Sequence, residues 1–132
     1  MNLPNGAMVA VVDGEKLLLF KNTGHEDIKL TALEGPAIAD RASGSAGHHS
    51  SAANPDTDTQ AEDGFALGVA GTLNQWALSG KISDLLIVAA PRTLGELRKH
   101  RHKALEALLV GEIAKDLTGH SADDIAAAIH KA

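Results

Sequence analysis

The chain has 132 residues, no cysteine, three aromatic side chains and a net charge of −5. This length suits one domain with a core of ordinary size, and the lack of cysteine excludes disulfides, thiolate nucleophiles and cysteine-based zinc sites. The sequence does not open like a signal peptide, and no stretch approaches the roughly 20 apolar residues of a membrane span. We therefore expect a cytoplasmic protein, and the acidic balance argues against indiscriminate binding of nucleic acid.

The first 33 residues predict a three-stranded meander. Residues 7–12 are an apolar run that ends at Asp13-Gly14, a pair favoured in type I′ hairpin turns. Residues 16–21 supply the second strand, and residues 28–33 alternate apolar and polar side chains as a half-buried strand does.

Residues 35–62 form a long polar segment whose only large apolar side chain is Ile38. Structureless connections longer than about 12–15 residues are usually functional or disordered. Ordering each residue costs roughly 1–2 kcal/mol, so this segment is expected to be flexible in the free chain. We interpret it as an insertion within a single domain over 1–132 that becomes ordered on a partner, with Gly47, His48 and His49 as candidate contact residues. A linker without a role is the alternative.

A helix is predicted to follow the insertion. Thr59 and Glu62 have the spacing of a capping box, and apolar side chains recur at helical spacing up to a stop at Gly80. Trp76 lies in the apolar stripe of this helix, which favours a core position over a platform for base stacking.

The last third of the chain alternates strands and helices. Residues 85–90 are an unbroken apolar run typical of a strand buried on both faces, and residues 92–102 read as a helix. Residues 108–113 fit either a continued helix or a strand, and we assign a strand. Ser121 begins a capping-box-like sequence that opens a final helix.

The predicted order, βββ-loop-α-β-α-β-α, is that of the α/β ribonuclease H-like fold with a mixed sheet. Two-metal nucleases of that fold need carboxylates on central strands to hold the ions. Residues 9–12 and 89–91 contain none, and Asp13 is interpreted as a turn residue. We therefore expect neither a metal site nor nuclease activity, and no sequence motif indicates a cofactor.

Charge is unevenly distributed. Between residues 92 and 103 the only acidic residue is Glu96, accompanied by His100, His102 and five cations. Such a cluster can bind phosphates, although a solvated helix face is the common alternative. The five candidate phosphate-binding residues are Arg92, Arg98, Lys99, Arg101 and Lys103.

Two motifs resemble the bacterial host attachment protein family, and the resemblance covers nearly the whole chain. The first has the form APRxLGxLR, carried by Ala90, Pro91, Arg92, Leu94, Gly95, Leu97 and Arg98, and the second is KDLT, carried by Lys115, Asp116, Leu117 and Thr118. The family name records a role in attachment to plant host cells. Such proteins are similar to the central domain of translation release factors and of the ribosome-rescue factor pelota, so the resemblance implies a ribonuclease H-like topology.

In release factors a loop of this domain carries Gly-Gly-Gln, which assists hydrolysis of peptidyl-tRNA. This sequence contains no Gly-Gly-Gln. The resemblance therefore implies a noncatalytic module that uses its insertion and its basic cluster on a ribosome or a tRNA.

An alternative function is hydrolysis of an ester or a phosphate, with His48 or His49 and Asp116 as the acid and base. Lys115, Asp116 and Thr118 follow the last predicted strand, where α/β folds often place functional groups. Asp116 and Thr118 can equally close the turn into the final helix. No spacing marks a nucleophile with its base.

Overall fold

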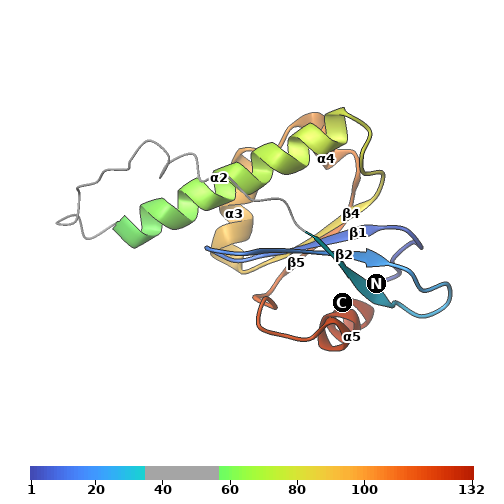
Figure 1. Cartoon of the computed structure of the whole chain (residues 1–132). Coiled ribbons are helices and arrows are strands. Elements are labelled where there is room, and N and C mark those ends of the chain that lie inside the picture. Colours follow the sequence, from blue (N-terminus) through green and yellow to red (C-terminus); the bar gives the residue numbers. More distant parts are fainter. Residues whose placement is uncertain (35–56) are drawn as a thin grey trace.

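The computed structural model describes residues 1–34 and 57–132, which form a five-stranded sheet with helices on both faces (Figure 1). The α/β class, the mixed sheet and the predicted order of elements are confirmed, apart from one additional short helix. The candidate insertion residues Gly47, His48 and His49 lie outside the described residues.

The sheet has the order β3-β2-β1-β4-β5. The antiparallel part contains β1 (Met8–Val12), β2 (Leu17–Asn22) and β3 (Leu30–Leu33), and β4 (Leu85–Ala89) and β5 (Leu109–Ala114) add parallel neighbours beyond β1. Helices cover both faces of the central strands, which explains their continuous apolar sequences. The carboxyl ends of β1, β4 and β5 lie at one edge of the sheet, which we call the carboxyl edge.

Three helices cover one face of the sheet, and a fourth covers the other (Figure 1). The first face carries α2 (Thr57–Leu78), α3 (Pro91–Lys99) and α4 (Lys103–Glu106), and the second carries α5 (Ala122–Lys131). Because successive strand residues point to opposite faces, β1 and β4 contribute to both cores. The first core includes Val12, Leu73, Ile87, Leu94 and Leu105, and the second includes Val11, Phe20, Leu86, Ile125 and Ile129.

The first hairpin turn differs from the prediction. A type I′ turn needs positive φ at both central residues, but among the described residues only Gly6 and Gly80 have positive φ. The Asp13 carboxylate instead accepts hydrogen bonds from the backbone N–H groups of Glu15, at 2.7 Å, and Lys16, at 2.6 Å. A local Asx turn therefore replaces the expected type I′ turn.

Two helix boundaries also differ. Helix α2 begins at Thr57, before the capping box predicted at Thr59, so the end of the predicted insertion is helical. The helix predicted over 92–102 ends at Lys99, and α4 follows as a separate turn. One contribution to the break is local, because His102 Nδ1 accepts the N–H of Ala104 at 3.0 Å and so caps a new helix.

Two further predictions are confirmed. The ambiguous segment over 108–113 is a strand, displaced by one residue to Leu109–Ala114. Ser121 caps α5 by accepting the N–H of Asp124 at 3.1 Å. Within the described part of the chain, none of the helices combines the length and the apolar character needed to cross a membrane.

Candidate nucleic-acid interface

Helix α3 presents the first part of the basic cluster. Pro91 occupies its first turn, where the missing N–H costs nothing. Leu94 and Leu97 are buried and fix the inward face of the helix. Arg92 and Lys99 lie seven residues apart, close to two full turns, so both project from a single side of the helix.

Two exposed ion pairs involve these cations. Arg92 contacts Asp63 of α2 at 2.9 Å, and Lys99 contacts Glu96 at 2.8 Å. The hydrogen bond between Lys99 and Glu96 lowers the pKa of the Glu96 carboxyl and raises the pKa of the Lys99 ammonium. Exposed pairs of this kind contribute little to stability, so both cations can exchange their carboxylate partners for phosphates.

A more buried ion cluster links the turn after α3 to β5. The Glu112 carboxylate accepts hydrogen bonds from Arg98, at 3.1 Å, and from Arg101. The Arg101 side chain is only 12% exposed, and its Nε is buried without a hydrogen-bond partner. This burial assigns Arg101 a positioning role beneath the surface, whereas Arg98 is 53% exposed and can reach a ligand.

Burial of the Glu112 carboxyl opposes its ionisation and is the largest single influence on its pKa. The hydrogen bond from Arg98 and the charges of Arg101 and Arg98 together outweigh that burial, and they hold the Glu112 pKa below its ordinary value. Glu112 is therefore an ionised anchor at neutral pH.

Asn74 of α2 fixes the turn between α3 and α4. Its amide nitrogen donates to the carbonyl of His100 at 2.8 Å, and its amide oxygen accepts the N–H of His102 at 2.8 Å. Lys103, which begins α4, is exposed and is in no ion pair with the side chains of residues 1–34 and 62–132. The turn therefore presents Lys103 beside the cations of α3 on a fixed backbone.

We call the four exposed cations Arg92, Arg98, Lys99 and Lys103, together with Arg101 beneath them, the basic surface. They lie on α3, α4 and the intervening turn, on the face of the sheet that α2 also covers (Figure 1). Five cations less the four carboxylates of Asp63, Glu96, Glu106 and Glu112 leave a formal charge of +1. The surface thus stays cationic on an acidic chain.

The other candidates, Lys115, Asp116 and Thr118, follow β5 at the carboxyl edge. The Thr118 hydroxyl lies 2.9 Å from Asp13 Oδ2 and 2.8 Å from Asp116 Oδ1, so it can donate to either carboxylate. The hydrogen bonds from the Thr118 hydroxyl and N–H lower the pKa of the Asp116 carboxyl. A lowered pKa makes Asp116 a weak proton acceptor, and its contacts close the turn that follows β5. Lys115 is exposed beside this turn.

Sequence reasoning missed the groups that hold the basic surface in place. Asn74 carried no distinctive signal, because its partners are backbone groups more than 25 residues away. Glu112 did carry one, since it is a lone charge among the apolar residues of a strand. Within the described ranges, no three His, Asp or Glu side chains are grouped so that they can hold a metal ion.

A search of curated proteins found no match. Residues 6–129 match the family described as Bacterial archaeo-eukaryotic release factor family 12. This match spans every strand of the sheet and the basic surface. The chain therefore belongs to the bacterial archaeo-eukaryotic release factor family 12.

Proposed function

We propose that this chain is a noncatalytic, cytoplasmic module that binds the RNA of a ribosome or a tRNA through its basic surface. The observation that carries the proposal is the group of exposed cations on α3 and α4 of a chain whose net charge is −5. Membership of a release factor family supports the choice of ribosome or tRNA over other polyanions.

The proposed mode of binding is contact with phosphates. Arg92 and Lys99 are about 10.5 Å apart along the axis of α3, since each helical residue rises about 1.5 Å. This separation lets the two side chains meet different phosphates of a folded backbone. Base stacking is disfavoured, because Trp76 is half-buried in the first core and Lys81 Nζ lies 5.0 Å from the centre of its ring.

A noncatalytic role is supported by the chemistry of the available groups. The sequence has no Gly-Gly-Gln. The lowered pKa of Asp116 weakens the alternative in which that carboxylate acts as a base in ester or phosphate hydrolysis. We therefore propose that binding itself, without turnover, is the activity of residues 1–132 as a single domain.

The experiment is binding of fluorescently labelled tRNA, measured by anisotropy over a series of salt concentrations. A Lys99→Ala, Lys103→Ala double variant should bind more weakly, and the slope of log affinity against log salt should fall by about 2, one for each lost phosphate contact. Both side chains are exposed, so the variant should fold normally.

The matched control is Lys131→Ala, which removes an exposed cation from α5 on the other side of the sheet. It should leave the salt slope unchanged. Equal slopes for the wild type and the double variant, or no binding by the wild type, would contradict the proposal.

A further inference from the structure

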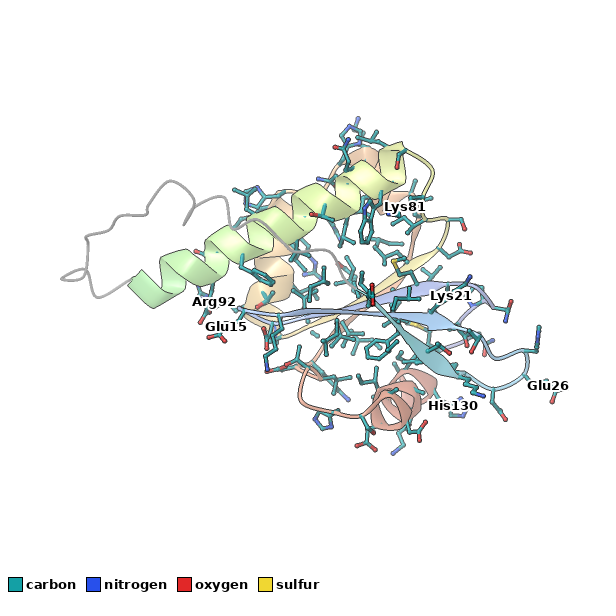
Figure 2. All side chains as sticks on the ribbon, viewed as in Figure 1. Glu15, Lys21, Glu26, Lys81, Arg92 and His130 are labelled. Carbon is teal, nitrogen blue, oxygen red and sulfur yellow. The ribbon has the colours of Figure 1, made fainter. Side chains whose placement is uncertain are left out.

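A groove lies on the other side of the sheet, between the segment that precedes β3 and helix α5. Figure 2 shows His130 on this side of the molecule, with Glu26 on the nearby turn, whereas Arg92 and Glu15 lie toward the opposite end of the sheet. Six residues line the groove: Asp27, Ile28, Asp123, Ala126, Ala127 and His130.

The sequence of α5 creates this groove. Ile125 and Ile129 are buried against the sheet, and Ala126 and Ala128 are partly buried against the same core, whereas Ala127 is exposed. Asp123, Ala127 and His130 follow one another at spacings of four and three and therefore share a face of the helix. Because Ala126 and Ala127 have only methyl side chains, they form a low apolar floor between the taller Asp123 and His130.

Neither carboxylate of the groove is in an ion pair with another described side chain. The carboxylates found in ion pairs within residues 1–34 and 62–132 are those of Asp63, Glu96 and Glu112. Asp27 and Asp123 are both exposed, and neither is in one of these pairs. The two segments that flank the groove, residues 25–29 and 122–131, contain four acidic residues and two lysines, a formal charge of −2 with neutral histidines.

We propose that this groove binds an arginine or lysine side chain from a basic segment of a partner protein. The aliphatic stem of such a side chain would lie on Ile28 and the two alanine methyl groups, as long cationic side chains do on apolar surfaces. Its charged head would meet Asp27 and Asp123, and charge-assisted hydrogen bonds to carboxylates are stronger than neutral ones.

The size of the groove supports one side chain as its occupant. Its volume is about 260 Å³, below the roughly 300–1,000 Å³ of pockets that hold drug-sized ligands. This binding is independent of the proposed RNA contact, because the groove and the basic surface lie on opposite sides of the sheet (Figure 1).

The test is an NMR titration of the isotopically labelled full chain with the peptide acetyl-Arg-Gly-Arg-Gly-Arg-amide. The matched peptide has glutamine at each arginine position. The arginine peptide should shift the amide signals of Ile28, Ala126 and Ala127, and the glutamine peptide should not.

A double variant, Asp27→Asn with Asp123→Asn, should weaken binding of the arginine peptide about tenfold. The control variant, Glu15→Gln with Glu106→Gln, neutralises two exposed carboxylates elsewhere and should leave the affinity unchanged.

A second variant separates groove binding from general attraction to an acidic surface. Ala127→Leu fills the floor without changing any charge, and Ala127 is exposed, so the substitution should be tolerated by the fold. We expect a several-fold loss of peptide affinity. Unchanged affinity in this variant, or signal shifts spread over all acidic regions of the chain, would overturn the proposal.

Discussion

Glu112 shows how one residue supports a charged surface that it does not itself form. Its carboxylate binds Arg98, which is exposed, and Arg101, whose guanidinium is largely buried. Removing one partner of such a pair leaves the other charge without compensation. The carboxylate therefore matters more for stability than the two exposed pairs on α3 do.

We predict that Glu112→Gln lowers the free energy of unfolding at pH 7 by about 1–3 kcal/mol, the cost of leaving a buried polar group poorly satisfied. The measurement is denaturation by urea. The control is Glu106→Gln, which changes an exposed carboxylate in no ion pair among the described residues and should have little effect.

The contacts of Glu112 with Arg98 and Arg101 also predict that stability depends on pH. The pKa of Glu112 is lower in the folded chain than its ordinary value of 4.5. Its contribution is therefore fully present above that value and is lost as the pH falls through the lowered folded pKa. The difference in unfolding free energy between the wild type and Glu112→Gln should shrink below about pH 4. A difference that stays constant down to pH 2 would contradict the assignment.

The contact between Arg101 and Glu112 could not be predicted from sequence. Arg101 belongs to a run of basic residues that predicts an exposed phosphate site. Arg101 is buried because the fold brings the turn after α3 next to Glu112 of β5. The cations of the basic surface could be predicted from the sequence, but the burial of Arg101 among them could not.

At the scale of elements, helix α3 carries both the cations and a competitor for them. Glu96 lies between Arg92 and Lys99 along the helix and holds the Lys99 ammonium. A phosphate that binds Lys99 must replace the Glu96 carboxylate as its partner. The phosphate is also repelled by the negative charge of that nearby carboxylate. The helix thus limits the affinity of its own surface.

We predict that Glu96→Gln raises the affinity for tRNA by up to about fivefold. This factor corresponds to the upper value, about 1 kcal/mol, of the interaction energy of an exposed ion pair. The measurement is the anisotropy titration with labelled tRNA at low salt. Glu26→Gln makes the same change in net charge on the far turn and should leave affinity unchanged (Figure 2). Equal gains in both variants would attribute the effect to net charge rather than to release of Lys99.

The order of elements was predictable because apolar side chains recur with the periods of strands and helices. The break between α3 and α4 was not, since it depends on hydrogen bonds from Asn74 on another helix. The type of the first hairpin turn was also missed. There, Asp13 uses its side chain where the Asp-Gly pair predicted a backbone with positive φ.

At the scale of the whole molecule, the sheet separates two surfaces of opposite charge. The basic surface shares a face with α2, and the acidic groove lies at α5 on the other face. Sequence revealed the basic run but not the groove, because Asp27 and Asp123 are nearly 100 residues apart. The fold also joins Asp13 to Thr118, 105 positions along the chain, which no local pattern indicates.

The proposed RNA interface is the surface formed by α3 and α4. Hydrogen exchange along the full chain tests it most directly, measured for the free protein and with tRNA or protein-free ribosomal RNA at low salt. We predict added protection over residues 91–106 and none over α5. Protection confined to α5, or identical exchange with and without RNA, would contradict the proposed interface.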